Sequence, residues 1–248
     1  EILGIDNHND YYDPKLKFSR LKRFEDHPNF TQSSINIDNK ELLFESVLDF
    51  DPEIIINLAA QPGVRYSLEN PQAYITSNIV GFFNILEVSR EIDVEHLIFA
   101  SSSSVYGANT NIPFKANSSI DHPLNLYAAT KKSNESISHA YSHIYGTPIT
   151  GLRFFTVYGP WGRPDMAPMI FIDKILKGEE ITINNNGDHR RDFTYIDDIV
   201  SGIERVTETK PNPCENWNSF EPTPNSSSAP WKIYNLGRGK SIELLHFI

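Results

Sequence analysis

Cysteine, net positive charge and long apolar runs are all scarce in this sequence of 248 residues. Cys214 is the only cysteine, so no disulfide can form within the chain and a cysteine-based metal site is not expected. The 8 histidines are scattered without ligand spacing, so we expect no metal site of any kind. No apolar run approaches the ~18 residues of a membrane-spanning helix and no signal peptide is seen, which predicts a cytoplasmic protein that does not bind a membrane.

The charge balance limits the partners further. Lysine and arginine total 22 against 32 aspartates and glutamates, which gives a net charge of −10. A surface of this sign disfavours broad binding to nucleic acid or to an anionic membrane. An anionic ligand would therefore have to be met by a local cluster of arginines. The 39% of apolar residues suffices for a packed core.

Polar, flexible flanks are also missing. Glu1 leads directly into the apolar run Ile2–Ile5 without an initiator methionine, and the chain stops at Ile248 inside an apolar pattern. Natural domain boundaries are more often polar. We therefore expect a fragment that is cut through structured elements at both ends, and its activity in this form is left open.

Short apolar runs alternate with amphipathic stretches of helical length along the chain. The expected strands are 2–5, 54–58, 96–100, 149–155, 181–183 and 231–236, and the expected helices are 40–50, 78–92, 127–145 and 168–176. A polar, proline-rich stretch at 207–230 reads as a long loop. The alternation predicts the α/β class with a doubly wound parallel sheet.

Tyr127 and Lys131 share one helix face, because positions four apart lie one turn from each other. A free tyrosine titrates near pH ~10, which is too high for a base at neutral pH. A nearby ammonium, together with the positive charge of an oxidised nicotinamide, favours the phenolate and lowers the pKa of Tyr127. The pair indicates proton transfer, although an incidental tyrosine and an exposed lysine can show the same spacing.

A serine run, 101–104, follows the expected strand 96–100 directly. Ligands of doubly wound sheets bind beyond the carboxyl ends of the strands. A hydroxyl there could hydrogen-bond a substrate oxygen while Tyr127 moves its proton. Serine-rich turns are common, but a serine run at a strand end followed by a Tyr-x-x-x-Lys helix is a more specific combination.

Asp6 ends the first expected strand. In a dinucleotide-binding fold, a carboxylate in this place accepts hydrogen bonds from the adenosine ribose and repels a 2′-phosphate, which predicts NAD over NADP. The Gly-x-x-Gly-x-x-Gly loop that would hold the pyrophosphate does not occur in the sequence. Its expected place is upstream of Asp6.

Several motifs, spread over nearly the whole chain, together resemble the extended short-chain dehydrogenases that act on nucleotide sugars, and among them the UDP-glucuronate 4-epimerases. These motifs are 4–7 with 10–14, 57–67, 100–107, 127–131, 153–166 and 190–198. The block 153–166 is the most specific, whereas the Tyr/Lys pair is shared by the whole superfamily. The resemblance implies a Rossmann-like NAD-binding domain over 1–158 that lacks its first strand. Residues 159–248 would form mainly a smaller substrate domain, with 231–236 returning to the Rossmann sheet.

The resemblance implies an isomerase that holds NAD and uses it catalytically. Tyr127 would take the proton from the sugar 4-hydroxyl, Ser102 would assist it, and Lys131 would bind the nicotinamide ribose. The 4-keto sugar would rotate and be reduced on its other face, so the net redox change is zero. The further cofactor contacts implied are Asp6, Asn7, Asn36, Ile37, Leu58, Ala59, Ala60, Asn78, Ala100 and Ser101.

For a UDP-sugar substrate, the resemblance implies that Arg191 contacts the diphosphate, with Arg65 and Arg163 as further candidates. Thr156 stands where galactose-type epimerases carry asparagine. Its short hydroxyl would leave room for a C5 carboxylate and donate to it, as Ser103 and Ser104 could. The implied reaction is the interconversion of UDP-glucuronate and UDP-galacturonate.

Other functions stay open at this point. Thr156 and the block 153–166 disfavour a UDP-glucose/galactose 4-epimerase. Ser103 and Ser104 stand where UDP-glucuronate decarboxylases typically carry an acidic residue, which disfavours that reaction. A truncated, inactive binder of dinucleotides or nucleotide sugars is the remaining alternative, and the cofactor content of the purified chain separates it from the enzymes. A homodimer that pairs through helices 78–92 and 127–145 is also left open.

Overall fold

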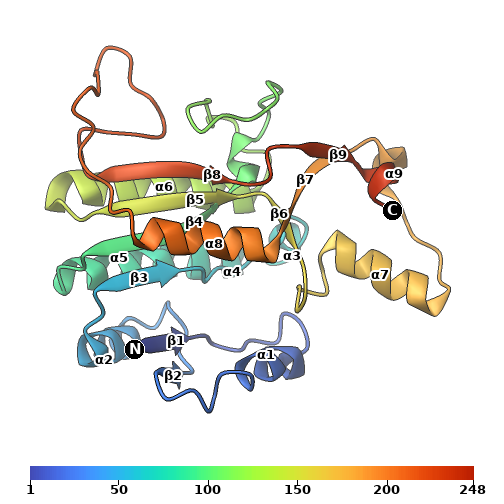
Figure 1. Ribbon diagram of the computed structural model, residues 1–248, viewed down its shortest axis with the longest axis horizontal. Helices are drawn as coiled ribbons and strands as arrows, with labels where there is room; N and C mark the ends of the chain where they lie inside the picture. The colour runs from blue at the N-terminus through green and yellow to red at the C-terminus, as the bar shows by residue number, and fades with distance from the viewer.

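The computed structural model describes all 248 residues, apart from the side chains of Asn184 and Asn185. Strands and helices alternate along the first two thirds of the chain (Figure 1). In order, these elements are β1 (Ile2–Ile5), α1 (Pro14–Leu21), β2 (Phe30–Ser33), α2 (Lys40–Phe50), β3 (Ile54–Asn57), α3 (Tyr66–Glu69), α4 (Pro71–Tyr74), η1 (Ile75–Gly81), α5 (Phe82–Glu91), β4 (His96–Ser102), η2 (Ser103–Tyr106), α6 (Leu126–Tyr145) and β5 (Ile149–Phe154). This alternation confirms the predicted α/β class.

The main sheet is parallel and runs in the order β3-β4-β5-β8. Its last strand, β8 (Trp231–Leu236), comes from far along the chain and pairs with β5 from Ile149 opposite Trp231 to Phe154 opposite Leu236. β1 and β2 pair in parallel in a separate two-stranded sheet, which lies beyond β3 in Figure 1. All these strands point the same way, so their carboxyl ends face one side of the molecule.

Most of the remaining elements lie beyond that side, whereas α8 (Ile196–Thr207) lies across one face of the main sheet and contacts β4 (Figure 1). In chain order, the remaining elements are β6 (Thr156–Tyr158), α7 (Ala167–Lys177), η3 (Asn184–Gly187), β7 (Arg190–Tyr195), α8, β9 (Ser241–Glu243) and α9 (Leu244–Phe247). β6, β7 and β9 form a small mixed sheet. The strand expected at 181–183 is wrong: Ile181 and Ile183 pack against buried Phe171, Phe193 and Leu244, but this stretch is not paired as a strand. Burial of apolar side chains in an irregular segment produced the same apolar pattern as a strand.

The principal core lies between the main sheet and helices α2 and α5. Leu43 of α2, Leu86 of α5 and Leu97 of β4 are fully or almost fully buried within it. The rings of Phe82 and Phe99 pack with centroids 5.0 Å apart. Each such side chain stabilises the fold by roughly 1.5–3 kcal/mol relative to an exposed one. The core therefore fixes β4, whose carboxyl end carries the serine run.

The helix expected at 78–92 begins earlier and is not uniform. α4 starts with Pro71 at its first turn, where the Asn70 side chain accepts from the Ala73 amide (3.3 Å), and a π-helical turn, η1, connects α4 to α5. π-Helical turns are rare in proteins, and those that occur are often found at functional sites. No helix among the described residues is long and apolar enough to cross a membrane.

His96, at the start of β4, should make stability depend on pH. It is 2% exposed, its Nε2 lies 2.8 Å from the Thr150 hydroxyl, and burial, aided by the charge on Lys210, lowers the pKa of His96 from 6.5 to about 4. In the unfolded chain His96 binds a proton with its ordinary pKa of 6.5, whereas in the folded chain it binds a proton only near pH 4. Stability is therefore lost as pH falls through this window, by roughly 2 kcal/mol between pH 7 and pH 5.

Urea unfolding of the parent and of His96→Gln at pH 7 and pH 5 measures this effect. The glutamine can keep a hydrogen bond to Thr150 but does not titrate. We expect His96→Gln to lose less stability than the parent between pH 7 and pH 5, by roughly 2 kcal/mol. Equal losses in the two proteins would show that folding does not lower the pKa of His96.

Candidate active site

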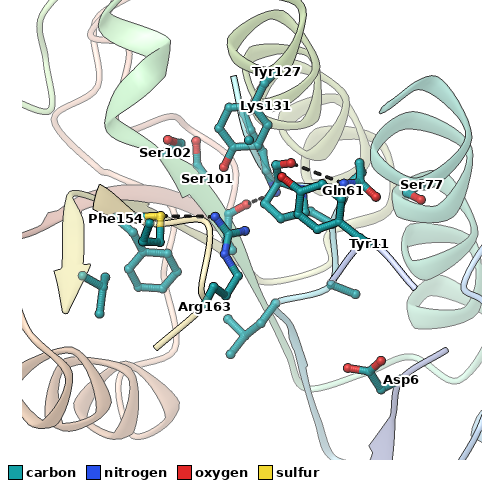
Figure 2. A pocket seen from close by; sticks show the side chains of 18 of the residues that line it. Asp6, Tyr11, Gln61, Ser77, Ser101, Ser102, Tyr127, Lys131, Phe154 and Arg163 are labelled. Atoms are coloured by element: carbon teal, nitrogen blue, oxygen red, sulfur yellow. Dashed lines mark hydrogen bonds between the residues drawn. The ribbon is translucent and has the colours of Figure 1, made fainter. Parts of the chain in front are cut away.

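A cavity of about 660 Å³ opens at the carboxyl ends of β1, β2, β3, β4 and β5 (Figure 2). It gathers most of the residues that the sequence predicts for the site. Those that line it are Asp6, Asn7, Asn36, Ile37, Leu58, Ala59, Ala60, Ala100, Ser101, Ser102, Ser103, Ser104, Tyr127, Lys131, Thr156 and Arg163. Residues that are up to 157 positions apart in sequence thus meet in one place, because parallel strands bring their carboxyl ends together.

The Tyr127/Lys131 pair lies on the first turns of α6. Asn125 caps this helix by accepting from the Ala128 amide (2.8 Å), which fixes the turn that carries Tyr127. The Tyr127 ring packs edge to face on the buried Tyr74 ring, with centroids 6.3 Å apart. Lys131 is 3% exposed, and its ammonium donates to the Ala100 carbonyl (2.8 Å) at the end of β4. One helix thus holds a phenol and an ammonium against the strand end with the serines.

Burial raises the pKa of Tyr127 above its usual 10, while a hydrogen bond with Ser102 and the positive charge on Arg163 lower it. Burial also lowers the pKa of Lys131 to about 8, so its ammonium is still largely charged at neutral pH. From sequence, we expected Lys131 to favour the phenolate. In the structure, the cation that lowers the pKa of Tyr127 is Arg163, and the Lys131 ammonium is bound to the backbone instead.

The four serines of the run, 101–104, make different contacts. The hydroxyl of Ser101 donates to the Glu135 carboxylate (2.5 Å), away from the reacting groups. The Ser102 hydroxyl accepts from the Ser104 amide (3.2 Å) and is the one that reaches Tyr127. Ser103 and Ser104 lie on the next turn, η2, and line the cavity.

An ion pair is buried directly behind these serines. Glu135 accepts two hydrogen bonds from Arg153, to Nε (2.9 Å) and to Nη2 (2.8 Å), and the two side chains are 4% and 0% exposed. Arg153 also donates to the Tyr106 hydroxyl (3.0 Å) and the Ala116 carbonyl (3.0 Å). The pair ties α6, β5 and the segment after η2 together around Ser101.

One end of the cavity has the donor set of a nucleoside site. The Asp6 carboxylate accepts from the His8 amide (2.7 Å) through one oxygen, so its second oxygen can accept from ribose hydroxyls. The Asn7 side chain donates to Asn36 (3.3 Å), and Ile37 beside it is 7% exposed. Near the other end, the Lys131 ammonium can donate to a second ribose. These residues fit a dinucleotide, and the pyrophosphate-binding glycine loop is not part of this sequence.

Only some of the substrate-binding residues predicted from the sequence line the cavity. Thr156 on β6 and Arg163, whose side chain is 27% exposed, line the cavity. Arg191 on β7 does not: it is exposed, and its Nη1 donates to the Arg190 carbonyl (2.9 Å). Arg65 is also exposed and lies outside the cavity lining. The structure therefore does not bring Arg65 and Arg191 into the cavity lining, and their contact with substrate stays a prediction.

Asn78 is also placed differently from the prediction. It is 1% exposed, and the cavity lining includes its neighbour Ser77 instead. Its amide donates to the Gln61 carbonyl and the Thr130 hydroxyl (both 3.1 Å) and accepts from the Gln61 amide (2.7 Å). Asn78 thus holds the loop after β3 in place and does not itself face the cavity.

Several lining residues were not identified from the sequence. They are Tyr11, Tyr12, Lys17, Gln61, Ser77 and Met166, together with Ile196, Ile199, Val200 and Ile203 of α8. Burial lowers the pKa of Lys17, whose ammonium donates to the Asn9 side chain (2.6 Å). The spacing of the α8 residues, one apolar face of a helix, was the signal that could have found them.

Comparison with known proteins agrees with this geometry. Residues 2–218 match the family described as "NAD dependent epimerase/dehydratase family". Protein CapI of Staphylococcus aureus is 53% identical over 247 residues, which is 100% of this chain and 74% of that protein. A probable UDP-glucuronate 4-epimerase of Rhizobium meliloti is 45% identical over 249 residues, which is 100% of this chain and 73% of that protein.

A solved structure shows the same arrangement. The UDP-glucuronic acid 4-epimerase of Bacillus cereus, crystallised with UDP-glucuronic acid and NAD, superposes with a TM-score of 0.82 and 32% identity. The match covers 99% of this chain and 72% of that one. A family match over most of the sequence, and relatives of 45–53% identity that the chain covers over more than two thirds of their length, lead to one assignment. The chain belongs to the NAD dependent epimerase/dehydratase family.

Proposed function

We propose that this protein is a nucleotide-sugar 4-epimerase that interconverts UDP-glucuronate and UDP-galacturonate with bound NAD. One observation carries the choice of sugar: the hydroxyls of Ser103, Ser104 and Thr156 and the cation of Arg163 line the cavity that Tyr127 faces. A buried carboxylate without donors would cost several kcal/mol. Relatives named as UDP-glucuronate 4-epimerases, in sequence and in structure, support the same sugar.

Tyr127 is the proton-transfer group of the proposed reaction. Its phenolate takes the proton of the sugar 4-hydroxyl as the C4–H bond breaks, and it returns the proton when the 4-keto sugar is reduced on its other face. The hydroxyl of Ser102, which is hydrogen-bonded to Tyr127, also binds the oxygen of the sugar 4-hydroxyl in this proposal. Arg163 favours the phenolate by its charge.

NAD, when bound, supplies the hydride acceptor and donor. Lys131 and Asp6 fit its two riboses, since an ammonium donates to ribose hydroxyls and a carboxylate accepts from them. In this proposal, residues 1–158 with 231–236 hold the cofactor and the rest of 159–248 mainly holds the sugar nucleotide.

The position of Asp6 predicts NAD over NADP. Its carboxylate faces the nucleoside end of the cavity, and a 2′-phosphate would meet like charge there. Titration of the purified protein with NAD and NADP should give at least ~10-fold tighter binding of NAD. Asp6→Ser should narrow the difference, while Asp10→Ser, which changes a nearby acidic residue outside the lining, should keep it. Tighter NADP binding by the parent would refute this placement.

A uronate should turn over faster than a neutral sugar, because a neutral hexose leaves some of the carboxylate donors unpaired. The purified protein is given UDP-glucuronate, UDP-galacturonate, UDP-glucose and UDP-galactose separately, and the products are resolved by NMR. We expect the uronates to exceed the neutral sugars in kcat/KM by ~10-fold or more.

Thr156→Asn is the matched variant. The longer side chain fills the space assigned to the carboxylate, so it should lower uronate turnover more than turnover of the neutral sugars. Faster turnover of UDP-glucose in the parent would favour the glucose/galactose alternative. Carbon dioxide and a UDP-pentose would favour the decarboxylase, and retention of NAD without any turnover would favour the inactive binder.

We also propose that a second copy of the chain pairs on α5 and α6. These helices pack together, and they leave Phe83, Ile144 and Tyr145 exposed (42%, 65% and 51%). Apolar surface of this kind is typical of an interface. Light scattering of the parent and of Phe83→Glu would test it, with a monomeric parent as the contrary result.

A further inference from the structure

A loop on the substrate side of the cavity is tied to the segment that follows Asp6. The loop is residues 159–166, which connects β6 to α7 and carries Arg163. Arg20 of α1 donates to its Trp161 and Gly162 carbonyls (2.7 and 3.4 Å). The Tyr11 hydroxyl donates to the Asp165 carboxylate (3.0 Å). These contacts join parts of the chain that lie 141 to 154 residues apart.

The two terminal nitrogens of the Arg20 guanidinium are both engaged, whereas its Nε is buried without a hydrogen-bond partner. Its Nη1 donates to the Tyr12 hydroxyl (2.5 Å), and the guanidinium lies over the Tyr12 ring, 5.3 Å from the centroid. The neighbouring Arg23 lies 5.4 Å from the centre of the Trp161 ring. Ordering a long arginine side chain costs conformational entropy, which these contacts must offset.

Asp165 links the second contact to the site. One carboxylate oxygen accepts from Tyr11, and the other pairs with Arg163 Nε (3.2 Å). The Tyr11 hydroxyl keeps its proton at neutral pH, since burial and the Asp165 charge raise the pKa of Tyr11 to about 12. Arg163 in turn is close enough to Tyr127 for its charge to lower the pKa of that phenol. Figure 2 shows Tyr11 and Arg163 in the same part of the cavity as Tyr127.

We propose that Tyr11 and Arg20 are positioning residues: they clasp the loop 159–166 and so fix Arg163 over the bound sugar. Neither residue needs to touch the sugar, because Tyr11 acts through Asp165 and Arg20 acts through the loop backbone. The segment 6–20 begins at the nucleoside end of the cavity, so the clasp also links that end to the substrate end. The effect on sugar binding rests on the proposed function, whereas the clasp itself does not.

Tyr11→Phe removes the hydroxyl that holds Asp165 and keeps the ring, which packs on Tyr66 (centroids 4.9 Å apart). We expect KM for UDP-glucuronate to rise about 10-fold, as for the loss of a hydrogen bond to a charged group. In an Arg163→Ala background the same change should have less than a ~2-fold effect, since groups that act through one another are not additive. Tyr66→Phe is the control: its hydroxyl accepts from Asn70 (3.1 Å), and KM should stay within ~2-fold.

Hydrogen exchange of the loop tests the clasp without turnover. The amides of Gly162 and Met166 donate within the loop, to Gly159 (3.2 Å) and Arg163 (3.3 Å), so they report its order. In Tyr11→Phe and in Arg20→Lys, which keeps the charge but cannot span both carbonyls, they should exchange several-fold faster, with α6 unchanged. Faster exchange in a protein that does not use UDP-glucuronate would uphold the clasp and refute the proposed function. The clasp would be refuted if loop exchange were unchanged in both variants. It would also be refuted if Tyr11→Phe raised KM by the full ~10-fold in the Arg163→Ala background.

Discussion

Replacing Tyr127 by phenylalanine should lower kcat by ~10²–10⁴-fold or more and leave the affinity for the UDP-sugar within a few-fold. The change removes only the hydroxyl that takes and returns the proton. The ring would stay packed on Tyr74, and the Asn125 cap of α6 is untouched, so the cavity should keep its shape. Steady-state turnover of UDP-glucuronate and calorimetric titration with the same nucleotide sugar measure the two quantities separately.

Tyr145→Phe is the matched control for this variant. Tyr145 ends the same helix, is 51% exposed, and lies outside the cavity lining. Its replacement should leave kcat unchanged within error. If Tyr127→Phe kept activity within a few-fold of the parent, Tyr127 would be a structural residue and the proposed chemistry would need another base.

Breaking the buried Arg153–Glu135 pair should cause the largest loss of stability. Glu135→Ala leaves the guanidinium of Arg153, 0% exposed, without its counter-charge, and leaves the Ser101 hydroxyl without its acceptor. Removal of one partner of a buried pair typically costs about 3–5 kcal/mol. Urea unfolding at neutral pH should show this as a lower midpoint with a similar slope.

Two further variants show whether charge and burial are the cause. Glu135→Gln keeps an acceptor oxygen for Arg153 and should lose clearly less stability than Glu135→Ala. Asp121→Asn removes the partner of Lys132 in a more exposed pair, which links the segment before α6 to that helix, and it should change stability little. Equal losses of stability in Glu135→Ala and Asp121→Asn would mean that the buried pair contributes no more to stability than the exposed one.

The sequence was most informative where the fold follows from local patterns. The apolar runs at 54–58, 96–100 and 149–155 correspond to β3, β4 and β5 within a few residues. Because parallel strands end on one side, Asp6, the serine run and Tyr127 could be expected in one cavity before any coordinates were known.

Side chains whose partners are distant in the sequence were not predictable in this way. Glu135 and Arg153 are charged, so by composition they would be placed at the surface, and only the packing of α6 on β5 brings them together. Tyr11 meets Asp165 for the same kind of reason. Arg191 is positioned by the pairing of β7 with β9, which no local pattern specifies.

The central claim is that Tyr127 and its neighbours epimerise a UDP-hexuronate at C4 by moving one hydrogen off that carbon and back. UDP-glucuronate that carries deuterium at C4 tests this most directly, with the products read by NMR in ordinary water. We predict that UDP-galacturonate forms with deuterium retained at C4 and that none passes to the solvent. Loss of the label to water, or formation of a UDP-pentose with release of carbon dioxide, would contradict the account.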